Sequence, residues 1–333
     1  MATLGLIVNS AARRVKHRYL APHPFWRGLL PDESVRVTRS LEELEEAVVE
    51  FRERGIQVVA ALGGDGTLHR MIDVLIRHQD EADLPMVLAL AGGTMNGLPR
   101  ALGTGGAPER ALSTALDALH GGALPVTRRH VLRILDRNEG CTRHGFGFAT
   151  GLAYRAFEEY YRSPEPGMAD ALRASLLPLK AALFHQPFFD GARLGVEADG
   201  APWLPEAPHT LVASVVDNPV LWFKPFGAPL GDARAFHLVA TSMRPGEMAV
   251  RLWSIFRGRC RHPKLRAGQS REVTARGGSG YLIDGDRYPA GGGIDVRLTV
   301  GPTLRFVGPL RDHPGAVASR HPRLRIGDGR DDV

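Results

Sequence analysis

The chain has few of the residues and patterns that define several large classes of protein. It contains only two cysteines in 333 residues, Cys141 and Cys260, which are far apart in the sequence. This spacing gives neither a disulfide framework nor a cysteine-based metal motif, and it favours two free thiols in a reducing cytoplasm. No run of about 18 apolar residues occurs, so we expect no membrane-spanning helix.

Lysine is also scarce, and the positive charge is carried almost entirely by arginine. The formal net charge is +6, and only four of the 42 basic residues are lysines. Net positive charge suits nucleic acid, an anionic membrane or an anionic substrate. The chain lacks zinc-finger spacing, an RNP-like aromatic motif and a dense basic block, so nucleic acid is not an expected partner. Nucleotide phosphates and anionic lipid headgroups fit better.

The first 125 residues alternate between strand-like and helix-like segments. The N-terminal apolar run lacks a preceding basic region and ends at Asn9-Ser10, so it indicates a buried strand and not a signal peptide. We expect strands at 4–8, 34–38, 56–62 and 86–90, and helices at 41–51, 68–78 and 108–120. Such alternation predicts an α/β domain with a doubly wound parallel sheet, which binds ligands at the carboxyl ends of its strands.

After residue 125 the pattern changes to short runs separated by proline and glycine. The expected strands are 131–135, 145–150, 192–196, 210–216, 236–241, 271–275, 280–283, 294–300 and 304–307. Their spacing predicts an antiparallel β domain, interrupted by a helical insertion over 152–189. We therefore expect domains at 1–125 and 126–310, followed by a disordered tail at 311–333.

A glycine-rich turn, Gly63-Gly64-Asp65-Gly66-Thr67, joins an expected strand to an expected helix. Glycines let the backbone approach a ligand closely, and a helix N-terminus attracts phosphate. A carboxylate beside a phosphate calls for a cation, which suggests a nucleotide with Mg²⁺. The motif is neither G-x-G-x-x-G nor a P-loop, and a simple tight turn is the alternative interpretation.

A second glycine turn follows the next expected strand, with the sequence Gly92-Gly93-Thr94-Met95-Asn96. In a parallel sheet it should lie beside the first turn, at the same edge. Thr94 and Asn96 add polar side chains at a helix start, where capping is their ordinary structural role. Two glycine turns facing one crevice are harder to explain as loops alone.

The third motif is Asp284-Gly285-Asp286, which follows an apolar run near the end of the β domain. Asp-Gly between two strands is a strong signal for a hairpin turn. The alternative is a carboxylate that the second domain delivers to the crevice. Spacing alone does not decide between the two.

The order of these motifs resembles the diacylglycerol kinase catalytic family. Asn9, the GGDGT turn, the G-G-T-x-N turn and Ile283-Asp284-Gly285-Asp286 follow one another as in bacterial soluble lipid kinases and the related sphingosine and ceramide kinases. The resemblance covers about residues 3–308. It implies a nucleotide-binding α/β domain, a β-sandwich lipid-substrate domain and an active site in the cleft between them. It also implies ATP, Mg²⁺ and a lipid hydroxyl as phosphoryl acceptor.

The resemblance also implies roles for individual residues. The first turn would hold the ATP phosphates, with Asp65 near the metal, and the general base for the acceptor hydroxyl would be Asp284 or Asp286, with Asp284 favoured. The remaining implied nucleotide-binding residues are Asn9, Thr38, Gly63, Gly64, Gly66, Thr67, Gly93, Thr94 and Asn96.

The sequence departs from the family pattern at three places. Ser10 follows Asn9 where the family has proline, and Arg70 stands where glutamate is common. The family's Pro…Asp-Gly segment is degraded to 229–233, so a structural metal at Asp232 has weak support.

These observations lead us to expect a cytoplasmic, peripherally membrane-associated lipid kinase that uses ATP and Mg²⁺. Its acceptor would be a primary hydroxyl of diacylglycerol first, and of ceramide or a sphingoid base second. NAD kinase, which shares GGDGT and a β-rich second domain, is one alternative, and a non-catalytic nucleotide or lipid binder is another. The apolar segments 172–189 and 220–226 are candidate membrane contacts, although core packing is their default explanation. The sequence gives no oligomeric state.

Overall fold

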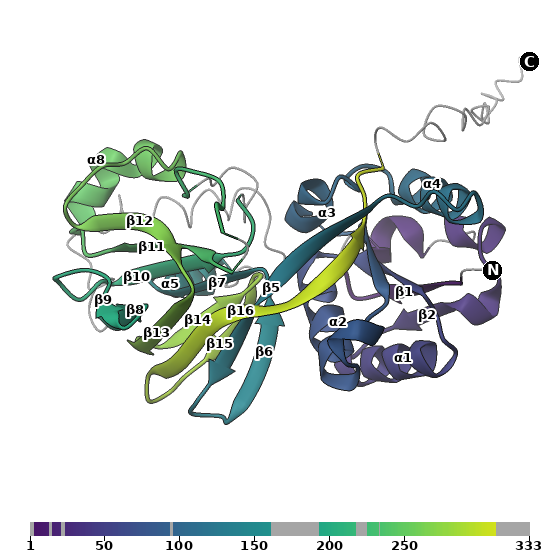
Figure 1. The fold of residues 1–333 in the computed structure, drawn as a ribbon, viewed down its shortest axis with the longest axis horizontal. Coiled ribbons are helices and arrows are strands. Elements are labelled where there is room, and N and C mark those ends of the chain that lie inside the picture. Colours follow the sequence, from purple (N-terminus) through teal and green to yellow (C-terminus); the bar gives the residue numbers. More distant parts are fainter. Residues whose placement is uncertain are drawn as a thin grey trace, which may run out of the picture.

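A computed structural model describes residues 3–12, 15–20, 24–93, 96–160, 193–217, 225–232 and 234–310. Two lobes lie side by side, and two long strands, β5 (Val126–Asp136) and β16 (Ile294–Val307), run between them (Figure 1). The expected tail at 311–333 and most of the expected helical insertion lie outside the described residues.

The first lobe is built on parallel strands whose order is β2-β1-β3-β4-β16. The first four are β1 (Leu4–Asn9), β2 (Val35–Thr38), β3 (Val58–Gly63) and β4 (Met86–Ala91). The side chains of β1, β3 and β4 are almost all buried on both faces, as expected for strands covered by helices on each side. The predicted parallel sheet is confirmed.

Helices cover the two faces of this sheet through alternate strand residues. Ile7 on one face packs with α1 (Leu41–Glu53) and α2 (Asp65–His78), whereas Leu6 and Val8 on the other pack with α4 (Pro108–His120). The short elements of the lobe are α3 (Gly97–Ala101) and the turns η1 (Val15–Tyr19), η2 (Phe25–Gly28), η3 (Asp32–Ser34) and η4 (Glu81–Asp83).

The second lobe contains a separate antiparallel sheet of order β12-β11-β10-β7-β14-β15, as the sequence predicted. Its strands are β7 (Gly147–Gly151), β10 (Thr210–Ser214), β11 (Phe236–Thr241), β12 (Leu265–Ser270), β14 (Gly280–Ile283) and β15 (Asp286–Pro289). The first sheet extends into this lobe through β5, β6 (Cys141–Gly145), β8 (Leu194–Ala198), β9 (Ala201–Pro202), β13 (Glu272–Gly277) and β16. Two helices, α5 (Leu152–Tyr160) and α8 (Pro245–Phe256), complete it.

Strand β16 joins the two lobes. Its first half pairs with β13, and Phe306 near its end pairs in parallel with Val87 of β4. The expected runs 294–300 and 304–307 are thus one strand with an irregularity between Val300 and Thr303. The boundary expected at 125/126 stays a prediction, but the first sheet includes residues from the end of the chain.

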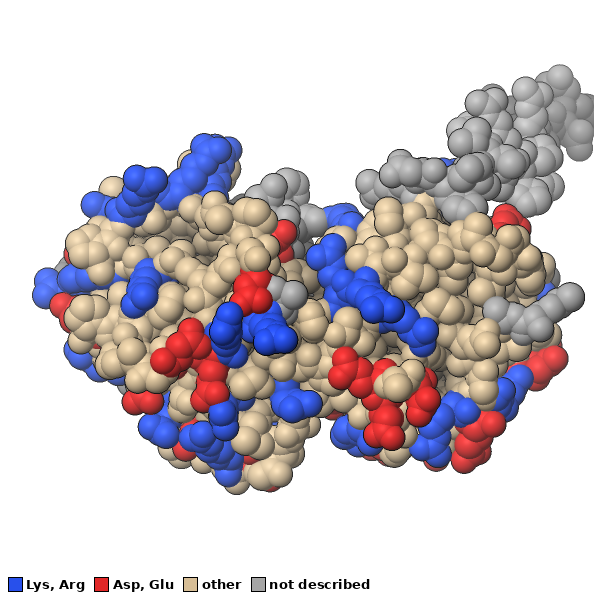
Figure 2. All heavy atoms as spheres, viewed as in Figure 1, with Lys and Arg blue, Asp and Glu red and all other residues tan. Residues whose placement is uncertain are grey.

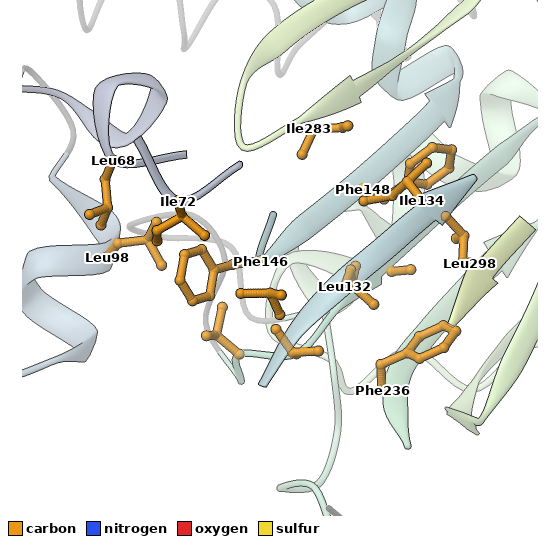
Figure 3. Close-up of a cluster of buried hydrophobic side chains, with 14 of the residues drawn as sticks. Leu68, Ile72, Leu98, Leu132, Ile134, Phe146, Phe148, Phe236, Ile283 and Leu298 are labelled. Carbon is orange, nitrogen blue, oxygen red and sulfur yellow. The ribbon is translucent and has the colours of Figure 1, made fainter. Parts of the chain in front are cut away.

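One buried cluster extends from the first lobe into both sheets of the second (Figure 3). Leu68 and Ile72 of α2 lie on one side of Phe146, and Leu132 and Ile134 of β5 lie further along. The Phe146 ring also contacts Phe306 at 5.6 Å between centroids. The lobes therefore share packing at the place where the expected site residues meet.

Candidate active site

The residues expected to bind nucleotide lie at the carboxyl edge of the parallel strands. Asn9 and Thr38 end β1 and β2 and are paired in register. The Asn9 amide donates to the Thr67 hydroxyl oxygen at 2.8 Å, which ties the end of β1 to the first turn of α2. Thr38 is buried, and its hydroxyl is 3.5 Å from the carbonyl oxygen of Val8.

The two glycine turns lie against each other, as the sequence predicted. A Cβ atom added at Gly93 would stand 2.5 Å from the Cα atom of Gly64, which is too close for any side chain. The Asn96 side chain fixes the second turn by accepting from the Gly93 amide and donating to the Gly93 carbonyl, each at 2.8 Å. Thr94 lies outside the described residues.

Helix α2 begins at Asp65, three residues earlier than the periodicity suggested, and no side chain in the described part of the chain caps it. Its N-cap is Gly64, so the backbone at this end stays open to an anion. The Asp65 carboxylate instead accepts from the amides of Gly97 and Leu98, at 3.0 and 3.1 Å, and so stabilises the start of α3. Burial raises the pKa of Asp65.

The Asp284-Gly285 motif forms a two-residue hairpin turn between β14 and β15, as the structural interpretation expected. Both residues have positive φ, 51° and 95°, which is the conformation of a type I′ turn. The hairpin also reaches the glycine turn: a Cβ atom at Gly66 would stand 2.9 Å from an Asp286 carboxylate oxygen. The hairpin and functional interpretations are therefore compatible.

Asp284 sits in an environment that raises its pKa to about 7, chiefly because it is buried. Its side chain is 7% exposed. The amides of Phe146 and Gly147 donate to its two oxygens at 2.9 and 2.8 Å, which favours the ionised form and opposes the effect of burial. Repulsion from Asp65 and Asp286 adds to the rise. A carboxyl group titrating near neutral pH suits general-base chemistry.

Asp286 is paired with Arg70, the residue that departs from the family pattern. The Arg70 Nε donates to Asp286 Oδ2 at 2.7 Å, and the guanidinium lies over the Tyr288 ring, 5.1 Å from its centroid. The ion pair links α2 to β15 and is partly exposed. Arg70 therefore neutralises one of the two candidate bases and leaves Asp284 without a cation at ion-pair distance among the described residues.

His69 is a member of the site that sequence reasoning missed. It is buried, and its Nε2 is 3.1 Å from the Tyr288 hydroxyl. Nδ1 lies 3.8 Å from Asp284 Oδ2. Burial lowers the pKa of His69 to about 4, so the imidazole is neutral at physiological pH. In the sequence, the only signal for His69 is its place in the first turns of the helix that follows the glycine turn. Its partners Tyr288 and Asp284 are more than 200 residues away, so the sequence could not indicate them.

A cavity of about 480 Å³ opens beside the hairpin. It is lined by Tyr154 and Glu158 of α5 and by Asp286, Arg287 and Pro289 of β15, together with Gly285. Asp286 thus lies between the glycine turns and this cavity.

The two residues expected to bind metal, Asp65 and Asp232, lie in different surroundings. Asp232 is ion-paired with Arg271 at 2.8 Å, away from the glycine turns. Within the described ranges, no group of three His, Cys, Asp or Glu side chains is arranged to hold a metal ion. Each Asp65 oxygen accepts one amide proton and retains a lone pair, so this carboxylate is compatible with a cation shared with a nucleotide.

An uncapped helix N-terminus thus lies beside two glycine turns and faces carboxylates from the second lobe, an arrangement that favours phosphate binding. Residues 3–123 match the family model described as the diacylglycerol kinase catalytic domain. The match covers the chain from β1 to α4, where both glycine turns lie, and it agrees with the expected resemblance.

Comparison with curated proteins gives one relative, a probable lipid kinase YegS-like protein of Stenotrophomonas maltophilia strain K279a. The two are 36% identical over 101 residues, which is 30% of this chain and 31% of that protein. The match thus spans about a third of the relative's length.

Solved structures share the fold over most of the chain. A diacylglycerol kinase from Bacillus anthracis strain Sterne has a TM-score of 0.58 at 11% identity, covering 92% of this chain and 96% of that one. Two further chains from the same organism give TM-scores of 0.63 and 0.60 at 14% and 13% identity, with the same coverage. At this identity the similarity establishes the fold alone. In the described part of the chain, no helix has the length and apolar character needed to cross a membrane.

Proposed function

We propose that this protein is an ATP- and Mg²⁺-dependent lipid kinase that transfers the γ-phosphoryl group to a primary hydroxyl of a neutral lipid. Diacylglycerol is the first candidate acceptor, and ceramide or a sphingoid base is the second. The protein would act in the cytoplasm, at the surface of a membrane, with its active site in the cleft between the lobes. The observation that carries the proposal is the position of Asp284 and Asp286 at the first turns of α2, opposite the paired glycine turns.

In this proposal the first lobe binds ATP. The open N-terminus of α2 and the backbone of Gly63, Gly64 and Gly66 receive the phosphates, because unpaired amides and the helix dipole favour negative charge. Thr67, held by Asn9, contributes its hydroxyl. Gly93, Thr94 and Asn96 form the opposite wall, and Thr38 contacts the nucleotide.

In the same proposal the second lobe supplies the base. The acceptor hydroxyl would lie in the cavity beside Asp286 and give its proton to Asp284. Its oxygen forms the new bond to the γ-phosphorus, the bond from that phosphorus to the β,γ-bridging oxygen breaks, and ADP leaves with the electron pair. The raised pKa of Asp284 supports this role because a base is most effective when its pKa is near the working pH.

Asp65 is the residue that would hold Mg²⁺ with the phosphates, and the ion would supply neutralisation of phosphate charge. Asp232 was a second expected metal ligand, and its pairing with Arg271 gives that assignment no support.

The test is phosphoryl transfer from labelled ATP by the purified protein. Diacylglycerol, ceramide, sphingosine and NAD serve as separate acceptors, with and without Mg²⁺. We expect label on diacylglycerol or ceramide, and only when Mg²⁺ is present. Label on NAD alone would instead identify an NAD kinase. ATP binding without transfer to any acceptor would favour the non-catalytic binder.

A further inference from the structure

Helix α8 carries an apolar stripe that no other described residue of the protein covers. Its inner face packs through Met248, which is buried with Met243 and Leu152. The outer face presents Gly246, Val250, Trp253 and Arg257, which recur at intervals of four, three and four residues. Val250 is 84% exposed and Trp253 is 69% exposed, the highest values for large apolar side chains among the described residues.

Basic side chains surround this stripe. Residues 244–266 contain seven lysines and arginines and one acid, Glu247. Glu247 is already engaged, because its carboxylate accepts from the Arg244 amide at 2.7 Å and lies 3.6 Å from the Lys264 ammonium. Figure 2 shows Lys and Arg side chains along the end of the left-hand lobe where Figure 1 places α8.

The Arg257 guanidinium lies 4.3 Å from the centroid of the Trp253 ring. This arrangement holds a cation beside the exposed indole at the C-terminal end of the helix. Tryptophan and arginine both suit the boundary between lipid tails and headgroups, since each combines an apolar body with a polar end.

We propose that the outer face of α8 docks the protein on an anionic lipid bilayer. Val250 and Trp253 enter the headgroup boundary, and Arg257, Arg259 and Arg261 contact anionic headgroups. At 12 residues the helix is about 18 Å long, too short to span a bilayer, and its one-sided apolar face would place it in the plane of the surface. Apolar insertion and basic attraction together supply the two contributions that stable, reversible membrane binding needs.

Charge favours a bilayer over a second copy of the chain. A two-fold dimer through α8 would bring the same basic patch of each copy together, and like charges would repel. An anionic surface complements the patch. The inference rests on the proposed function only in that a membrane-resident acceptor explains why the protein visits a bilayer.

The test uses the full chain and vesicle sedimentation. We expect binding to phosphatidylcholine vesicles that contain about 30% phosphatidylglycerol, weak binding to phosphatidylcholine alone, and release by about 0.5 M salt. Trp253→Ala should weaken binding about tenfold, because it removes most of the inserted apolar surface. Arg257→Gln with Arg259→Gln should weaken binding to the anionic vesicles and remove much of its salt dependence.

Matched controls are Val37→Ala and Arg137→Gln, which change an exposed valine and an exposed arginine elsewhere. Both should bind vesicles as the unsubstituted protein does. Equal binding by the Trp253→Ala variant would overturn the proposal, and so would equal binding to neutral vesicles. A dimer or a nucleic-acid complex that Trp253→Ala abolishes, without vesicle binding, would assign the face to that partner and also overturn it.

The failure of this inference is separable from failure of the proposed function. Asp284→Asn should lose phosphoryl transfer and keep vesicle binding. Trp253→Ala should keep transfer to a dispersed short-chain diacylglycerol in the absence of vesicles. If no acceptor is phosphorylated but vesicle binding depends on Trp253, the docking face stands and the kinase assignment fails.

Discussion

Asp284 differs from Asp286 in its surroundings, although the two carboxylates are only two residues apart. Arg70 pairs with Asp286, whereas Asp284 is buried and accepts from two backbone amides. The environment therefore assigns them different chemistry. Arg70, which stands where the family often has glutamate, thus pairs with Asp286 and leaves Asp284 without a cationic partner at ion-pair distance among the described residues.

Asp284→Asn should lower kcat by about 10²–10⁴-fold, because the base that accepts the hydroxyl proton is removed. Asparagine tolerates the positive φ at this position, so the hairpin should persist. ATP affinity, measured by calorimetry, should stay unchanged. Asp286→Asn is the matched comparison and should reduce kcat less. If the two variants lose activity equally, the assignment of Asp284 as sole base is wrong.

The activity of the unsubstituted protein should rise with pH and level off above about 7, the pKa of the Asp284 carboxyl group. The quantity to measure is kcat/KM over a range of pH. A profile that is already flat well below pH 7 would contradict a base with a raised pKa.

His69 and Asp284 should make opposite contributions to the pH dependence of stability. The native state keeps His69 neutral down to about pH 4, whereas the unfolded chain protonates it near pH 6.5, so stability is lost as pH falls through that range. The native state keeps Asp284 protonated up to about pH 7, whereas the unfolded chain ionises it near pH 4, so stability is lost as pH rises.

His69→Gln removes the first contribution and leaves the second. Relative to the unsubstituted protein, this variant should gain about 2 kcal/mol in free energy of unfolding when pH falls from about 7 to about 4.5. Asp284→Asn should lose a similar amount over the same interval. Urea unfolding at the two pH values measures both changes. Parallel pH profiles for all three proteins would show that neither pKa is displaced.

At the scale of elements, the paired glycine turns depend on direct backbone contact. Gly93→Ala would place a methyl group 2.5 Å from the Gly64 Cα atom, so the two turns must separate. We expect a loss of about 1–3 kcal/mol in free energy of unfolding, and weaker ATP binding because the phosphate loop moves. Gly28→Ala is the control, since nothing lies within 4 Å of its added methyl group. Unchanged ATP affinity for Gly93→Ala would separate the turn contact from nucleotide binding.

The elements that local patterns predicted are those with strong periodicity or continuous apolar runs. The strand at Phe236–Thr241 and the helix at Pro108–His120 have the expected bounds, and the capping pattern at Ser40 is present. Strand β15 was missed because Asp286–Pro289 has no buried residue and depends on its partner β14. Helix α8 was also missed, although Pro245 in its first turn and Glu247 at its third position are helix-start signals that the sequence contains.

The sequence predicted the motifs of the candidate site, but it did not predict the side-chain contacts between them. The two glycine turns follow adjacent strands, so their proximity follows from parallel topology. The pairing of Arg70 with Asp286 and of His69 with Tyr288 links positions more than 200 residues apart. Local propensity contains no information about such pairs, because they depend on how the second lobe packs against α2.

At the scale of the whole molecule, Phe306 connects the lobes through backbone pairing with β4 and ring contact with Phe146. Phe306→Ala should cost about 3–5 kcal/mol in free energy of unfolding.

Trp26 and Trp203 are buried in the first and second lobes and report on each separately when the other tryptophans are replaced. We expect the fluorescence of Trp26 and of Trp203 to change in a single unfolding transition, because the two lobes share packing. Leu41→Ala, at an exposed position, should change little, and separate transitions for the two tryptophans would mean independent lobes.

The position of β16 also constrains how the protein folds during synthesis. The edge of β4 is covered by residues near 306, which the ribosome adds more than 200 residues after β4 itself. At about 5–20 residues per second, the nascent first lobe waits roughly 10–40 s with an unpaired apolar strand edge. Such an edge is a template for aggregation. We therefore expect chaperone dependence during translation, and a chain stopped before β16 should aggregate even though it contains every glycine turn of the phosphate site.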